Sequence, residues 1–175
     1  SQGENQLHGG PEGFDKRRWK IVRQNDSEVL FSLDSPDGDQ GFPGNLIASA
    51  RFTLTDDNRI AIEYRATVDK PCPVNLTNHV YFNLDGNQCD VRNHKLQILA
   101  DAYLPVDEMG IPYQGLKQVN DTSFCFRNAK AIAQDFLSDD DQRKVKGYDH
   151  AFLLQAKGDL SQPAAQVWSA DEKLQ

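Results

Sequence analysis

Strict alternation of apolar and polar residues is the feature that most constrains the fold of this chain. Between positions 59 and 66 the apolar side chains fall at every second residue: Ile60, Ile62, Tyr64 and Ala66. Charged side chains fill most of the positions between them: Arg59, Glu63 and Arg65. A period of two puts the apolar side chains on one face of an extended segment, so the pattern predicts a half-buried antiparallel strand.

The same alternation precedes this segment over Ala48–Leu54, and Asp56-Asp57-Asn58 connects the two runs. Alternating runs joined by turn-forming residues predict a β-hairpin. Further short apolar or alternating runs are also predicted to be strands: Trp19 to Ile21, Val29 to Leu33, Val74–Leu84, Leu96–Ala100, Ala151–Gln155 and Ala164–Trp168. Only Ala129–Leu137 has a helical pattern, and the acidic run Asp139-Asp140-Asp141 reads as a solvated loop. Many short strands separated by turns predict an all-β antiparallel sandwich.

The 175 residues suit one domain, which we predict to span residues 1–175. Ser1-Gln2-Gly3 is an unusual start, and the last segment, Trp168 to Gln175, has the pattern of an interrupted strand-turn-strand. We therefore expect the domain to be partial, with both ends cut from a longer protein.

Charge and cysteine content restrict the partners and the compartment. A formal net charge of −7 disfavours nucleic acid and anionic lipid, and no apolar run approaches the ~20 residues of a membrane span. The three cysteines, Cys72, Cys89 and Cys125, are odd in number and lack CxxC spacing. They predict reduced thiols in a cytoplasmic protein, with neither a disulfide framework nor a metal site.

The chain lacks the usual signatures of nucleotide, metal or serine-hydrolase chemistry, so its histidines are the chemical candidates. His8 precedes two glycines, where a tight turn or a ligand contact is possible. His79 interrupts a strand-like stretch together with Asn78 and aromatic residues, which fits either a polar core network or the wall of a sugar site. Asp149 precedes an apolar run and can be a turn former or a hydroxyl ligand.

Several segments in order resemble the aldose 1-epimerase family, the galactose mutarotases. The segment from Leu7 to Trp19, which contains His8-Gly9-Gly10, is similar to the family's HGG segment. The segment from Asp39 to Leu46 is similar to its GxxGFPG turn. Residues 77–84, Thr-Asn-His-Val-Tyr-Phe-Asn-Leu, resemble its TNHxYFNL segment. Leu104 to Glu108, Gly110-Ile111-Pro112 and Gly147-Tyr148-Asp149-His150 also match.

The resemblance implies a large antiparallel β-sandwich of the galactose mutarotase type, and an isomerase that interconverts the α and β anomers of galactose or glucose. It implies that His79 is the general acid and that His8 is an auxiliary group on the reacting sugar oxygen. His8, His79, Tyr81 and Asp149 are the implied substrate-binding residues. The family's arginine clamp and its general-base glutamate match no residue of this chain, so the piece by itself is expected to be weak or inactive.

The implied reaction opens and recloses the sugar ring by proton transfer, and it needs no metal and no organic cofactor. A histidine suits the acid because its ordinary pKa, about 6.5, lies near working pH. Two alternatives remain open at this stage: an epimerase of hexose 6-phosphates, for which Lys16-Arg17-Arg18 is the visible phosphate candidate, and a carbohydrate-binding module without chemistry. Unpaired sheet edges of a partial sandwich would also favour self-association of the chain.

Overall fold

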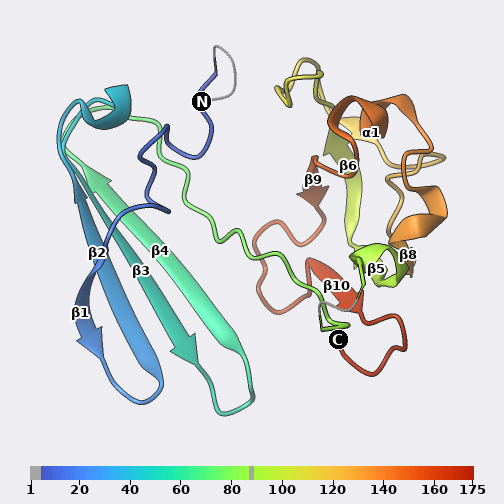
Figure 1. Cartoon of the computed structure of the whole chain (residues 1–175), viewed down its shortest axis with the longest axis horizontal. Helices are drawn as coiled ribbons and strands as arrows, with labels where there is room; N and C mark the ends of the chain where they lie inside the picture. The colour runs from blue at the N-terminus through green and yellow to red at the C-terminus, as the bar shows by residue number, and fades with distance from the viewer. Residues whose placement is uncertain (1–4, 87–88) are drawn as a thin grey trace. The chain divides into compact units, whose positions relative to one another are not determined.

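The fold consists almost entirely of antiparallel strands, seen in a computed structural model that describes residues 5–86 and 89–175. Its contacts divide the chain into two compact units, Ser1–Val80 and Tyr81–Gln175 (Figure 1). The single partial domain over residues 1–175 stays a prediction. Among the described residues, no helix is long and apolar enough to cross a membrane.

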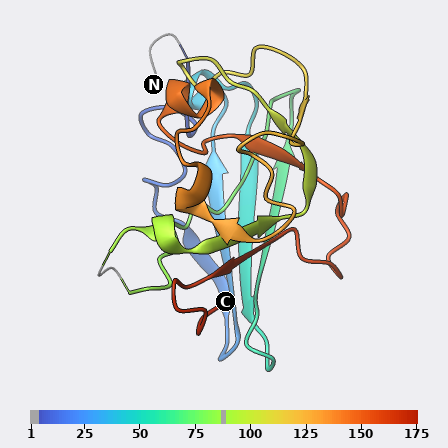
Figure 2. The same ribbon diagram turned by 90° about the vertical axis from the view of Figure 1, so that its right-hand side faces the viewer.

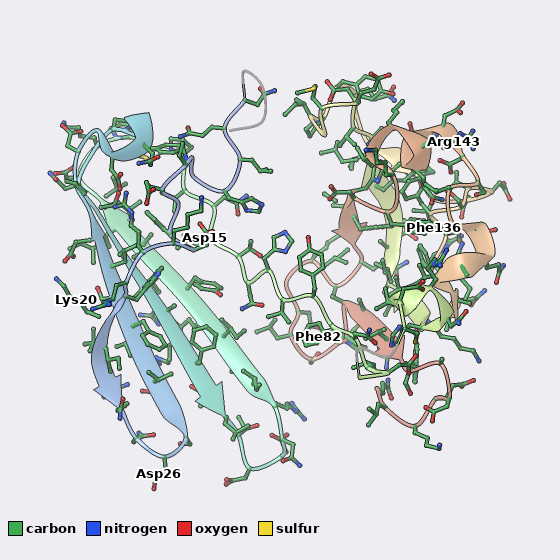
Figure 3. The ribbon with its side chains drawn as sticks, viewed as in Figure 1. Asp15, Lys20, Asp26, Phe82, Phe136 and Arg143 are labelled. Carbon is green, nitrogen blue, oxygen red and sulfur yellow. The ribbon has the colours of Figure 1, made fainter. Side chains whose placement is uncertain are left out.

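The first unit is a four-stranded antiparallel sheet in the order β1-β2-β3-β4. Its elements are β1 (Lys20–Gln24), β2 (Glu28–Ser35), the short 3₁₀ helix η1 (Asp39–Gly41), β3 (Leu46–Leu54) and β4 (Ile60–Val68). The predicted β3–β4 hairpin is confirmed, with Ala50 opposite Tyr64 and the Thr55 amide donating to the Arg59 carbonyl at 2.9 Å. Asp26 lies at the tip of the preceding β1–β2 hairpin (Figure 3).

The register of this sheet separates an apolar face from a charged one. Val29, Phe52 and Ile62 lie side by side across β2, β3 and β4, and the rings of Phe31 and Phe52 approach to 6.1 Å between centroids. On the opposite face, ion pairs run across the strands in sequence: Arg23–Glu28, Glu28–Arg51, Arg51–Glu63 and Glu63–Arg65. The alternation in the sequence therefore corresponds to two chemically distinct faces.

The second unit contains two three-stranded antiparallel sheets, in the orders β10-β5-β8 and β7-β6-β9 (Figure 2). In chain order its elements are η2 (Val91–Asn93), β5 (Lys95–Ile98), β6 (Ala100–Leu104), β7 (Lys117–Gln118), β8 (Lys130–Ala131), η3 (Ile132–Asp135), α1 (Asp140–Val145), β9 (Ala151–Leu154) and β10 (Ala165–Trp168). The strands predicted near residues 96–100, 151–155 and 164–168 are confirmed.

The core of the second unit joins β6 to α1 through one buried polar cluster. Tyr103 is fully buried and stacks on Phe124 with 3.9 Å between ring centroids. Its hydroxyl donates to the Asp141 carboxylate at 2.7 Å, and the ammonium groups of Lys117 and Lys144 lie 3.2 and 2.9 Å from the same carboxylate. Burial, and then the bond to Asp141, raise the pKa of Tyr103 to about 12. The Asp141 pKa is lowered because hydrogen bonds from Lys144, Tyr103 and Lys117 outweigh the cost of burial.

Three local expectations were wrong. Asp139 to Asp141 do not form a loop: Asp139 caps α1, Asp140 and Asp141 form its first turn, and Asp141 is 6% exposed. Acidic side chains at a helix N-terminus accept hydrogen bonds from the free backbone N–H groups there. Their negative charge also complements the helix dipole. The expected helix over Ala129–Leu137 is instead β8 followed by η3. The strand-like stretch Val74–Leu84 contains neither helix nor strand.

Candidate functional site

A pocket of about 520 Å³ lies within the first unit, beside the N-terminal segment and the η1 turn. That volume falls within the ~300–1,000 Å³ typical of small-molecule sites. Polar and apolar side chains share its wall, among them His8, His79, Asp15, Asp39, Gln40, Asn75, Phe14, Phe42, Leu46 and Leu76. The mixture suits a small ligand with hydroxyl groups and an apolar face.

The His8 side chain reaches this pocket from a turn with an unusual backbone. His8, Gly9 and Gly10 all have positive φ, at 54°, 76° and 94°. The turn closes through the Gly10 amide, which donates to the Leu7 carbonyl at 3.1 Å. Glycine adopts this region without steric cost, whereas a residue with a Cβ such as His8 does not. Strain of this kind is typical of functional positions, where the surrounding structure maintains it.

Gly13 makes this turn possible through close packing rather than an unusual φ. A Cβ at Gly13 would lie 2.1 Å from the carbonyl oxygen of His8. The chain therefore folds back directly onto the His8 backbone. A side chain at position 13 would displace either the turn or the segment that follows it.

The 3₁₀ helix η1 anchors the N-terminal segment by hydrogen bonds. The Gln40 side-chain oxygen accepts from the Glu12 amide at 3.3 Å, and the Gln6 side chain donates to the Gln40 carbonyl at 2.9 Å. Arg17 donates to the Asp39 carboxylate at 2.6 Å. These contacts connect the segment that carries His8 to residues 39–40, which line the same pocket.

The Asp39 carboxylate is held in its charged form. Burial opposes ionisation, but hydrogen bonds from the Ser35 hydroxyl and the Arg17 guanidinium outweigh that cost and lower the pKa of Asp39. Only 8% of its side chain is exposed. The Asp39 carboxylate therefore stays ionised at the pocket wall, and the Arg17 guanidinium balances its charge.

His79 lines the same pocket as His8, and the two side chains lie next to each other. The two imidazole rings are 5.3 Å apart between centroids and meet edge to face, with 62° between their planes. His79 stands on an extended segment without helix or strand, and its side chain is exposed. Two imidazoles at this distance can both contact one small ligand.

The other two residues expected at the site belong to the second unit. Tyr81 is 87% exposed at the start of that unit, and Asp149 is exposed two residues before the start of β9. Its neighbour His150 has both ring nitrogens buried without a hydrogen-bond partner among the described residues. Burial lowers the pKa of His150, whose ring meets that of Phe124 edge to face at 4.6 Å.

Sequence reasoning did not identify the side chains that complete the pocket wall. Asp15, Asp39 and Gln40 fall within the two segments that resemble the family motifs, yet no role was assigned to them. The sequence did indicate them, because carboxylate and amide side chains within glycine-rich motifs are candidates for ligand contacts. The Lys16-Arg17-Arg18 cluster is partly used within the unit: Lys16 donates to the Pro11 carbonyl at 2.6 Å, and Arg17 to Asp39.

Comparison with known proteins places the chain in a family. The family model described as aldose 1-epimerase matches residues 1–175. The chain is 79% identical to the aldose 1-epimerase of Escherichia coli (strain K12) over 175 residues, which is all of this chain and 51% of that protein. It is 41% identical to the galactose mutarotase of Bos taurus over 155 residues, which is 88% of this chain and 44% of that protein.

Solved structures agree with this placement. The crystal structure of galactose 1-epimerase from Lactobacillus acidophilus NCFM matches with a TM-score of 0.84 at 36% identity, over 96% of this chain and 49% of that one. The aldose epimerase homologue from C. elegans matches with a TM-score of 0.81 at 31% identity, over 98% of this chain and 51% of that one. The predicted all-β fold of the galactose mutarotase type is confirmed. The chain spans about half the length of the curated relatives it matches, and it belongs to the aldose 1-epimerase family.

Proposed function

We propose that this chain supplies the acid side of an aldose 1-epimerase site, which interconverts the α and β anomers of galactose or glucose. The observation that carries the proposal is the approach of the His8 and His79 rings to 5.3 Å at one pocket of ligand size. Family membership and the names of the relatives, aldose 1-epimerase and galactose mutarotase, support it independently.

In this reaction the anomeric hydroxyl O1 loses its proton to a base, C1 becomes a carbonyl carbon, and the C1–O5 bond breaks. His79 donates a proton to the ring oxygen O5 as that bond breaks. Rotation about C1–C2 followed by reclosure reverses both proton transfers. His8 donates a hydrogen bond to the reacting sugar oxygen, and Tyr81 and Asp149 bind hydroxyl groups. The base and an arginine clamp come from outside this chain.

The proposed location is the cytoplasm, where reducing conditions maintain thiols. Cys72, Cys89 and Cys125 all have free thiols. Galactose and glucose are the proposed small-molecule partners.

The decisive experiment replaces His79 by asparagine in a full-length protein that contains this chain. Asparagine can hydrogen-bond O5 but cannot protonate it near neutral pH, so mutarotation of α-D-galactose followed by polarimetry should fall by about 10²-fold or more. Galactose binding, measured by calorimetry, should persist. Val80→Ala is the matched control, because Val80 lies on the same extended segment and is 56% exposed. An undiminished rate in the His79→Asn protein would remove His79 from the proton transfer.

A further inference from the structure

Strand β4 forms one edge of the sheet in the first unit. It pairs with β3 on one side, and no strand of the described residues pairs with the other (Figure 2). Nine residues make it a long edge strand, and Ile60 and Ile62 on it are 68% and 38% exposed. Long exposed edges with apolar side chains are templates for pairing with another chain.

The hydrogen-bonding phase of β4 is determined by its pairing with β3. Thr55 bonds to Arg59 at one end of the hairpin, and the Asp69 amide donates to the Asn45 carbonyl at the other, at 3.3 Å. Because antiparallel strands alternate bonded and non-bonded pairs, the odd-numbered residues between these ends direct their N–H and C=O groups at β3. The outward groups belong to the even-numbered residues, Ile60, Ile62, Tyr64, Ala66 and Val68.

The sequence of β4 is complementary to itself about Tyr64. When two copies run antiparallel with Tyr64 opposite Tyr64, Ile60 faces Val68 and Ile62 faces Ala66 of the second copy. All of these are outward-bonding residues, so every free N–H in the edge meets a free C=O. They also belong to the apolar face, so the two sheets would share one continuous apolar surface.

The charged face matches in the same register. Glu63 of each copy faces Arg65 of the other, which forms two opposite-charge pairs across the twofold axis. Both side chains are accessible to a second copy, with 42% of Glu63 and 72% of Arg65 exposed, although within one copy they also pair with each other. Shifting the register by two residues in one direction puts Glu63 opposite Glu63, and in the other direction Arg65 opposite Arg65. Opposite charges stabilise cross-strand pairs and like charges destabilise them, so the charge pattern selects the register centred on Tyr64.

We propose that this chain forms a twofold dimer through β4, in which two four-stranded sheets join into one continuous sheet with Tyr64 at the axis. The occupant of the edge is a second copy of the same chain, because hydrogen-bonding phase, apolar pairs and charge pairs all match under that symmetry. Isologous twofold pairing of this type closes on itself and does not propagate into fibres. The proposal is independent of the catalytic role of the histidines.

The first test is charge exchange, with mass measured by sedimentation velocity over a range of concentrations. Arg65→Glu and Glu63→Arg each place like charges opposite one another, and each should weaken self-association roughly tenfold or more. Mixing the two variants in equal amounts should restore dimers, because the two strands are then complementary to each other. Arg18→Glu is the control, since it makes the same charge change at an exposed position of the same unit away from β4. Circular dichroism reports whether each variant remains folded.

The second test fixes the register and does not depend on charge. In a chain whose cysteines are replaced by serine, Tyr64→Cys should form a disulfide-linked dimer, because opposed Cα atoms of a bonded pair lie about 5.5 Å apart, within disulfide range. Thr67→Cys should not, because Thr67 faces Ala61. A chain that stays monomeric at every soluble concentration overturns the proposal. So does a dimer that ignores the charge exchange or that links through Thr67→Cys.

Discussion

At the scale of single residues, the position of the His8 imidazole depends on a close backbone contact with Gly13. The carbonyl oxygen of His8 occupies the space in which a Cβ at position 13 would lie, at 2.1 Å. The left-handed conformation of His8 and the location of its ring at the pocket are therefore coupled to a residue that has no side chain.

Replacing Gly13 by alanine should destabilise the first unit by about 1–3 kcal/mol, because a methyl group cannot share that space and the turn must shift. Thermal unfolding followed by circular dichroism measures the loss. Gly115→Ala is the control, because a Cβ there meets no atom within 4 Å. Equal stability of the two variants would show that the turn relaxes freely.

The candidate site could be predicted in part, and only through motifs. Nothing in the spacing of His8 and His79 indicates that their rings approach each other, because both lie outside regular strands where periodicity carries no information. The resemblance of their segments to a family identified both residues. Asp39 and Gln40 were not predicted as site residues, because their position depends on contacts between η1 and residues 6–17. These two segments are distant in the sequence, and no local pattern indicates that they contact each other.

At the scale of elements, α1 shows how a short helix can depend on one capping residue. The Asp139 carboxylate accepts from the Gln142 amide at 3.2 Å and also from the Ser123 hydroxyl. A helix of six residues has little intrinsic stability, so its capping and its tertiary contacts dominate.

Asp139→Ala should therefore cost about 1 kcal/mol or more of the free energy of unfolding. Asp140→Ala provides the matched control, because Asp140 lies in the same turn with 89% of its side chain exposed. Denaturant titration distinguishes the two. If both variants lose the same amount, the cap is not what stabilises α1.

The polar cluster between β6 and α1 predicts loss of stability at alkaline pH. Burial and Asp141 raise the pKa of Tyr103 from 10.0 to about 12. Because the folded pKa lies above the unfolded one, the contribution of Tyr103 is complete below pH 10 and declines as the pH rises towards 12. Urea unfolding at stepped alkaline pH should show this decline, and Tyr103→Phe should make it shallower. Tyr113→Phe, at a tyrosine that is 50% exposed, should leave the decline unchanged.

Strands with strict alternation were predictable, whereas elements that depend on capping were not. The period of two over residues 48–66 corresponds directly to β3 and β4, because one face of that hairpin is apolar and the other carries ion pairs. The Asp139 to Asp141 run looked like a loop because acidic side chains usually remain in water. Here Lys117, Lys144 and Tyr103 compensate for the burial of Asp141, and none of these partners is recognisable from the local pattern.

At the scale of the whole molecule, the chain matches about half of each relative, and we propose that the catalytic base lies outside it. We predict that the 175-residue chain alone equilibrates α-D-galactose at least about 10²-fold more slowly than the Escherichia coli relative, since one partner of the proton transfer is missing. Polarimetry at equal protein concentration is the measurement. A rate equal to that of the relative would mean that another group serves as base.

The anchoring of the N-terminal segment through Gln40 has a consequence for how activity and structure respond to stress. Side-chain amides hold His8 in place, whereas a continuous ladder of backbone hydrogen bonds holds the sheet behind it. Local opening of segments with few buried contacts requires less free energy than opening of a sheet. In a full-length enzyme that contains this chain, urea should therefore abolish mutarotation at concentrations at which the β-sheet signal is still complete.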